Sequence, residues 1–225
     1  MPSVLGPMID HTLLKPEATA ADIERLCSEA VHHELNAVCV NPYWAGHAAG
    51  ILGRSNVTVC TVVGFPFGAT RAETKRAEAT TALADGAGEI DMVVNLGAVK
   101  SGDLATAGAD IRAVRDATTG AVLKVIVEAT ALSEPELTRV VGIVAAEGAD
   151  FVKTSTGYHP TGGARIADVE LIRTALDGAP LGIKASGGIR SYEFATALID
   201  AGATRLGTSS SIALLTEEFA ATSAG

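Results

Sequence analysis

Short apolar runs alternate with longer stretches of mixed polarity along the whole chain. Most of the apolar runs lack a strict alternation of apolar and polar residues, which is typical of parallel strands buried on both faces. We predict eight strands, at residues 8–10, 37–40, 57–63, 89–94, 122–127, 150–153, 181–184 and 204–207. Amphipathic stretches between them predict helices, among others at residues 20–33, 69–85, 105–117, 134–147 and 169–176.

A weak internal repeat supports this alternation. The pair Gly-Ala at 86–87, 148–149 and 202–203 precedes Asp91, Lys153 and Gly207, respectively, by five residues, each at or near the end of a predicted strand. Eight units of about 28 residues are close to the minimum for a βα unit. The pattern therefore predicts a single α/β domain over residues 1–225, a (β/α)8 barrel with a short, frayed polar tail at 220–225. A doubly wound open sheet is the alternative, although no G-x-G-x-x-G follows the first strand.

Composition and charge exclude several classes of function. The chain is 48% hydrophobic with 24 glycines, which suffices for one large core. Its formal net charge is −9 and it has no basic tract, which argues against nucleic acid as a partner. No apolar run is long enough to cross a membrane, and no signal peptide is visible, so we expect a cytoplasmic protein. The three cysteines lack metal-ligand spacing, which predicts reduced, buried thiols.

Half of the six lysines fall inside predicted strands, where a buried ammonium loses its hydration. Lys153 and Lys184 end consecutive strands, so their amines are expected to lie close together and one of them to lose its proton near neutral pH. A neutral lysine is a nucleophile toward carbonyl groups. If Asp91 lies closer to Lys184, then Lys184 stays protonated and Lys153 becomes the neutral amine. Harmless ion pairing or helix capping is the alternative for each residue alone.

Glycine-rich loops follow the last two strands, the recurrent phosphate site of such barrels. They comprise Ser-Gly-Gly-Ile-Arg at 186–190 and Gly-Thr-Ser-Ser at 207–210. The backbone N–H groups of glycines and the N-terminus of a helix can bind a phosphate dianion. The alternative is that glycines in such short loops serve only to make turns. Lys124 lies early in its strand and is expected to pair with Glu128, Asp10 or Asp91, in either a structural or a catalytic role. Cys39 ends the second strand, where a core thiol is the alternative to a reactive one.

Five motifs lie near the ends of predicted strands. They read Asp-His-Thr-Leu-Leu at 10–14, Gly-Phe-Pro-Phe-Gly at 64–68, Glu-Ile-Asp-Met-Val-Val-Asn at 89–95, Phe-Val-Lys-Thr-Ser-Thr-Gly at 151–157 and Ile-Lys-Ala-Ser-Gly-Gly-Ile-Arg at 183–190. In this order and spacing, they resemble the signatures of the deoxyribose-phosphate aldolase family over nearly the whole chain.

The resemblance implies a class I aldolase on a (β/α)8 barrel. Such an enzyme reversibly cleaves 2-deoxy-D-ribose 5-phosphate to acetaldehyde and D-glyceraldehyde 3-phosphate, without a metal or an organic cofactor. By position, Lys153 would form the Schiff base, Lys184 would be the second lysine that perturbs it, and Asp91 would exchange protons through an ordered water. The residues expected to bind substrate are Asp10, Thr12, Cys39, Lys124, Thr156, Gly157, Gly187, Gly188, Arg190, Gly207, Ser209 and Ser210. The partners would be small phosphorylated sugars and aldehydes, and a homodimer is common among such barrels.

The sequence departs from the family pattern in two places. The loop at 158–163 is one residue longer than in the version best known to us, and it carries Tyr158 where some members carry lysine. Some members end in a tyrosine that assists proton transfer, whereas this sequence ends Thr-Ser-Ala-Gly, so that role is expected to be unfilled or taken by water. Two other functions stay open: another Schiff-base barrel enzyme of the transaldolase or sugar-bisphosphate aldolase type, and a non-catalytic phosphosugar-binding barrel.

Overall fold

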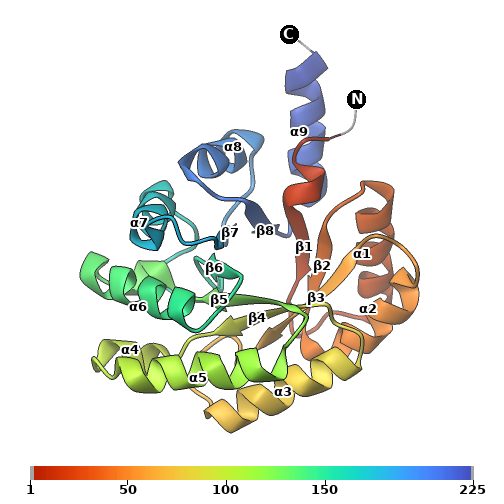
Figure 1. Cartoon of the computed structure of the whole chain (residues 1–225). Helices are drawn as coiled ribbons and strands as arrows, with labels where there is room; N and C mark the ends of the chain where they lie inside the picture. The colour runs from red at the N-terminus through yellow and green to blue at the C-terminus, as the bar shows by residue number, and fades with distance from the viewer. Residues whose placement is uncertain (1–2, 224–225) are drawn as a thin grey trace.

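Eight parallel strands close into a barrel in the order of the sequence, from β1 to β8 and back to β1 (Figure 1). The computed structural model describes residues 3–223. The strands are β1 (Ile9–Leu13), β2 (Ala37–Val40), β3 (Thr58–Val63), β4 (Glu89–Val93), β5 (Val122–Ile126), β6 (Phe151–Lys153), β7 (Gly182–Ser186) and β8 (Arg205–Thr208). This closure confirms the predicted (β/α)8 barrel and excludes the open doubly wound sheet.

Helices surround the barrel on its outer face. They are α1 (Ala20–His32), α2 (Ala45–Leu52), α3 (Ala72–Ala84), α4 (Leu96–Lys100), α5 (Leu104–Ala117), α6 (Glu134–Ala146), α7 (Ile166–Leu176), α8 (Tyr192–Ala201) and α9 (Ser211–Ser223). Short 3-10 turns occur at Gly6–Met8, Pro42–Trp44 and Ala129–Ala131. Capping boxes formed by Thr19 with Asp22 and by Ser133 with Glu136 fix the starts of α1 and α6.

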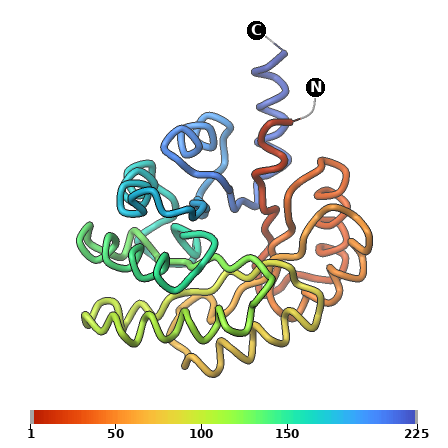
Figure 2. Tube along the Cα trace, in the orientation of Figure 1, coloured from red at the N-terminus to blue at the C-terminus, as the bar shows by residue number. Residues whose placement is uncertain are grey.

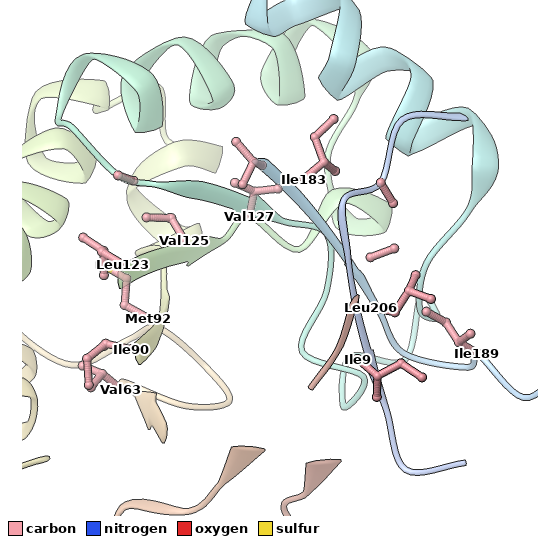
Figure 3. Close-up of a cluster of buried hydrophobic side chains, with 14 of the residues drawn as sticks. Ile9, Val63, Ile90, Met92, Leu123, Val125, Val127, Ile183, Ile189 and Leu206 are labelled. Carbon is pink, nitrogen blue, oxygen red and sulfur yellow. The ribbon is translucent and has the colours of Figure 1, made fainter. Parts of the chain in front are cut away.

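Alternate residues along each strand face opposite sides, and this alternation separates the polar barrel interior from the apolar outer layer. On β4, Ile90 and Met92 belong to the apolar core beneath the helices, as do Leu123 and Val125 on β5 (Figure 3). The residues between them are also buried, but they face the inside of the barrel and include charged groups. Both faces of the strands are therefore buried, which explains the unbroken apolar runs in the sequence.

The amino-terminal segment lies against the last helix, as the tube in Figure 2 shows. The Glu218 carboxylate of α9 accepts hydrogen bonds from the Ser3 hydroxyl and from the backbone N–H groups of Val4 and Leu5, the last two at 2.8 and 3.1 Å. Among the described residues, no helix has both the length and the hydropathy that a membrane span requires.

The predicted strands are all present, with ends that move by three residues at most. The largest shift is at β1, which begins at Ile9 and continues to Leu13. The prediction for residues 20–33 ends one residue beyond α1, and the one for 169–176 misses the first turn of α7. Residues 220–223 of the predicted tail are the last residues of α9, and Ala224 and Gly225 lie outside the described residues.

Candidate active site

The strand register places Lys153 and Lys184 side by side inside the barrel. Lys153 of β6 pairs directly with Lys184 of β7, and Lys184 pairs in turn with Arg205 of β8. On the other side, Asp91 of β4 pairs with Lys124 of β5. Because residues paired across parallel strands share one face of the sheet, all five side chains point into the same interior.

Asp91 is the acceptor at the centre of this group. Its Oδ2 lies 2.7 Å from the Lys153 Nζ and 2.6 Å from the Lys184 Nζ, and its Oδ1 lies 2.9 Å from the Lys124 Nζ. The Cys60 thiol donates a further hydrogen bond to Oδ1, at 3.2 Å. Asp91 therefore contacts the two lysines of β6 and β7 almost equally, so its distance from them does not decide which one is charged.

Asp10 distinguishes Lys184 from Lys153. Its Oδ2 is hydrogen-bonded to the Lys184 ammonium, and its Oδ1 accepts a 2.7 Å hydrogen bond from Arg205. Within residues 3–223, Lys184 thus has two carboxylate partners, whereas Lys153 has only Asp91. Burial by itself lowers the pKa of Lys184, but the carboxylates of Asp10 and Asp91 outweigh that effect and raise the pKa above its ordinary value of 10.5.

The other buried groups are also held in their charged forms. Burial disfavours the charged form of Lys124, but Asp91, Cys60, Asp10 and Glu89 raise its pKa well above the ordinary value. Burial likewise raises the pKa of Asp91, yet Lys124, Lys153 and Lys184 bring it well below 3.8. The group is consequently a network of ions that stabilise one another rather than a set of neutral side chains.

A count of charges singles out Lys153. The interior contains three acids, Asp10, Glu89 and Asp91. Three cations pair with them: Lys124, Lys184 and Arg205. Lys153 is the fourth base in an interior with three carboxylates, and it shares its carboxylate partner, Asp91, with Lys124 and Lys184.

A cavity of about 260 Å³ opens beside Lys153 at the carboxyl ends of the strands. Nine residues of the predicted site line it: Thr12, Lys153, Thr156, Gly157, Gly187, Gly188, Arg190, Gly207 and Ser209. Lys153 therefore borders a space for a small molecule, whereas Lys124 and Lys184 are fully buried and do not line it. The size and the polar wall suit a ligand no larger than a short sugar phosphate.

The glycines of this wall are required by close packing. A Cβ added to Gly163 would lie 2.2 Å from the Gly187 carbonyl oxygen, so the loops after β6 and β7 touch through their backbones. Gly187 itself has a φ of 89°, which disfavours any side chain. A Cβ at Gly207 would lie 3.0 Å from Cε of Lys184. Glycine at these positions therefore packs the loops together and leaves room for the lysine.

Glu128 supports the cavity wall instead of pairing with Lys124. It follows β5 in the left-handed conformation, with a φ of 52°. Its carboxylate accepts hydrogen bonds from the Thr156 hydroxyl at 2.5 Å and from the Thr156 N–H at 3.2 Å. Of the three partners predicted for Lys124, Glu128 is therefore wrong, because the turn carries its side chain toward the β6 loop.

Four predicted substrate-binding residues lie away from the cavity wall: Asp10, Cys39, Lys124 and Ser210. The first three are fully buried inside the barrel, and Ser210 begins the turn into α9, where its N–H bonds to the Thr208 hydroxyl. The prediction that these residues touch substrate is not supported by their positions. Asp10 and Lys124 instead belong to the ion network around Asp91 and Lys184.

The sequence reasoning missed two charged members of the network, Glu89 and Arg205. The Glu89 Oε2 lies 2.5 Å from the Lys124 Nζ, and Arg205 lies over the ring of Phe151. Both begin their strands, and a charged residue there is equally typical of a solvent-exposed strand start. Glu89 lies two residues before Asp91, and Arg205 lies two residues before Gly207. Residues two apart on a strand share a face, so this spacing was the signal that both side chains point into the barrel.

Two sets of side chains could in principle hold a cation: Cys39, Cys60 and Asp91, and Asp10, Cys60 and Glu89. In both sets the Lys124 ammonium already contacts two of the ligands: Cys60 at 3.4 Å and Asp91 in the first, Cys60 and Glu89 in the second. A metal ion would have to displace that ammonium. Lysine amines thus supply the positive charge of this site.

The chain is similar to known aldolases over most of its length. Residues 6–215 match the family described as DeoC/LacD family aldolase. A deoxyribose-phosphate aldolase of Brevibacillus brevis is 51% identical over 212 residues, which are 94% of this chain and 95% of that protein. One from Streptococcus pneumoniae (strain P1031) is 51% identical over 216 residues, 96% and 97% of the two chains.

Solved structures agree with the sequence comparison. A protein described as "QR15, an Aldolase" superposes with a TM-score of 0.93 at 39% identity, covering 98% of each chain. The deoxyribose phosphate aldolase from Aeropyrum pernix, described as tetrameric, has a TM-score of 0.87 at 35% identity and covers 94% of this chain and 89% of its own.

Proposed function

Because this chain belongs to the DeoC/LacD family of aldolases and is a carbon–carbon lyase, we propose that it reversibly cleaves 2-deoxy-D-ribose 5-phosphate through a Schiff base at Lys153. The observation that carries the proposal is the position of Lys153, the one buried lysine among the described residues that lines the cavity. We also propose that the barrel as a whole is one catalytic domain.

Bond cleavage requires a neutral amine and an electron sink. The Lys153 amine adds to the C1 aldehyde, and loss of water from the carbinolamine gives a protonated imine. The electron pair of the C2–C3 bond then moves into the imine and forms an enamine, while the 3-hydroxyl proton leaves to a base and C3 becomes the aldehyde of D-glyceraldehyde 3-phosphate. Protonation of the enamine at C2 and hydrolysis release acetaldehyde and restore the amine.

Asp91 and Lys184 are the groups placed to move these protons. Asp91 contacts the Nζ atoms of both lysines, so it can relay a proton between them or to a water in the cavity. Lys184 stays an ammonium because Asp10 also pairs with it, and it therefore offers a proton beside the reacting amine without competing as a nucleophile.

The far end of the cavity suits the phosphate. Gly187, Gly188, Gly207 and Ser209 come from the loops after β7 and β8 and form part of its wall. Backbone amides and a hydroxyl there can donate hydrogen bonds to phosphate oxygens. Contacts remote from the cleaved bond position C1 against Lys153 and thereby contribute to the rate.

Reductive trapping tests this proposal. The protein is incubated with acetaldehyde and sodium borohydride, digested, and mapped by mass spectrometry at all six lysines. We expect an ethylated amine at Lys153, while Lys124 and Lys184 stay unmodified because they are fully buried and charged. The exposed Lys100 serves as an internal control for unspecific alkylation.

A matched pair of variants completes the test. Lys153→Met should lose both the adduct and the cleavage of deoxyribose phosphate, whereas Lys100→Met should keep both. Binding of phosphate esters without any adduct at Lys153 would instead indicate a non-catalytic phosphosugar-binding barrel and would reject the proposal.

A further inference from the structure

Lys15 is a charged residue of the cavity wall that neither the motifs nor the ion network uses. It follows β1 and lines the same 260 Å³ cavity as Lys153. In residues 3–223 its ammonium forms no ion pair with a carboxylate. By contrast, Lys75, Lys100, Lys124, Lys153 and Lys184 all have carboxylate partners. The charge of Lys15 is therefore available to a ligand.

The charged residues of the cavity wall are all basic. It contains Lys15, Lys153 and Arg190, and no aspartate or glutamate lines it, although the chain has a net charge of −9. A wall with this composition concentrates anions locally in a protein that repels them overall. Since Lys153 is assigned to the carbonyl carbon, Lys15 and Arg190 are left to meet a negatively charged group.

Closure of the barrel brings Lys15 to the phosphate loops. β1 pairs with β8, with His11 opposite Thr208, so the residues that follow each of them emerge side by side. Lys15 lies four positions beyond His11, and Ser209 lies one position beyond Thr208; both line the cavity. The first and last loops of the barrel thus line the same cavity, and only ring closure makes them neighbours.

The backbone that carries Lys15 is held from two sides. The Leu14 carbonyl oxygen accepts a hydrogen bond from the Tyr158 hydroxyl at 2.8 Å and another from the Asn41 side-chain amide at 3.1 Å. The Tyr158 ring also packs edge-on against Phe65, with centroids 5.3 Å apart. Tyr158 therefore links the loop after β6 to the loop after β1 next to Lys15.

We propose that Lys15 binds the phosphate group of the substrate and thereby sets the preference for phosphorylated over free sugars, with Tyr158 as a positioning residue. The inference rests on the proposed function, since it takes a sugar phosphate as the occupant of the cavity. A lysine on a held loop can place one charge near a phosphate dianion without closing the cavity to the sugar.

The test compares kcat/KM for 2-deoxyribose 5-phosphate with kcat/KM for free 2-deoxyribose. In Lys15→Met the ratio of the two should fall roughly tenfold or more, the loss expected for one charge-assisted hydrogen bond. Lys15→Arg should restore most of the ratio. Arg54→Met removes the same charge on the loop before β3, at the other end of the barrel and away from the cavity, and should leave the ratio unchanged.

The dependence of KM on ionic strength and a second variant distinguish a loss of phosphate binding from a loss of structure in Lys15→Met. The KM of the wild-type protein for the phosphorylated sugar should rise with ionic strength, and this rise should be shallower in Lys15→Met because one screened attraction is gone. Tyr158→Phe keeps the ring but removes the hydrogen bond to Leu14, and should lower the ratio by a smaller factor, chiefly through KM.

The outcomes distinguish this inference from the function on which it rests. If Lys15→Met keeps the wild-type ratio, as Arg54→Met does, the assignment of Lys15 is wrong even though the aldolase stands. If the wild-type protein gives no borohydride adduct at Lys153, the proposed function itself fails. Equal losses for phosphorylated and free sugar in Lys15→Met would also reject a role in phosphate binding.

Discussion

At the scale of single residues, the site works by dividing one set of carboxylates unequally between two lysines. Lys184 contacts both Asp10 and Asp91, whereas Lys153 contacts Asp91 alone. The difference keeps the Lys184 amine charged, although both lysines lie on neighbouring strands in the same interior. Removal of Lys184 would leave Asp91 with Lys153 and Lys124 as its only lysine partners.

We expect Lys184→Leu to lower kcat/KM by about a hundredfold or more, which is the usual contribution of a proton-transfer group. The pH at which activity is half-maximal should also rise, because Asp91 would then pair more closely with Lys153 and favour its charged form. The measurement is kcat/KM from about pH 5 to 10. Lys100→Leu removes a surface lysine and serves as the control; a Lys184→Leu profile with an unshifted midpoint would remove Lys184 from the mechanism.

At the scale of elements, a second buried ion pair joins the helices behind the site. Lys75 of α3 donates to the Val93 carbonyl of β4 at 2.8 Å and to the Asp110 carboxylate of α5 at 2.5 Å. Burial lowers the pKa of Lys75 and raises that of Asp110 more than their attraction offsets. The burial cost therefore exceeds the gain from pairing, although each partner still needs the other.

Because each buried charge needs the other, the effects of replacing Lys75 and Asp110 on the free energy of unfolding should be strongly non-additive. Lys75→Met should lower the free energy of unfolding by about 3 kcal/mol or more, since it leaves Asp110 buried without a counter-charge. The double variant Lys75→Met/Asp110→Leu should recover most of that loss, because no buried charge remains. Urea unfolding of both single variants and the double variant measures the coupling; additive losses would show that the pair itself stabilises the packing of α3 on α5.

At the scale of the whole molecule, the carboxylates inside the barrel make stability depend on pH. Asp10 and Asp91 are fully buried, and despite the opposing effect of burial, their cationic partners hold both pKa values below the ordinary 3.8. As the pH falls through 3.8, the unfolded chain takes up protons that the folded chain refuses, so the free energy of unfolding decreases. The stabilisation from these two carboxylates is complete above the unfolded pKa of 3.8, and it is lost progressively as the pH falls from 3.8 through the lower pKa values of the folded protein.

The free energy of unfolding should consequently fall steeply below about pH 4. Replacing Asp10 by asparagine removes one of the two groups, and the slope in acid should decrease by up to about 1.4 kcal/mol per pH unit. Urea unfolding at a series of pH values compares the two proteins. Parallel curves in acid would mean that Asp10 does not take part in the linkage.

Much of this architecture could be predicted from the sequence because buried parallel strands leave a distinct pattern. The eight apolar runs predicted the barrel, and lysines within such runs marked Lys153 and Lys184. Glu89 and Arg205 were missed, since a charge at a strand start is also typical of an exposed position, and only their spacing of two residues from Asp91 and Gly207 indicates the interior face. Lys15 could not be placed either, because the path of a loop depends on contacts such as the one between Tyr158 and Leu14.

The pairing of β1 with β8 has a consequence for synthesis of the protein. A ribosome makes Asp10 early, but the Lys184 and Arg205 side chains that hold it are 174 and 195 residues away. A nascent chain that stops before β7 therefore contains Asp10 without the Lys184 and Arg205 counter-charges, and Lys153 without the residues that surround it in the folded barrel. Translation must run nearly to the last helix before any molecule can be active, so prematurely terminated products should have no partial activity.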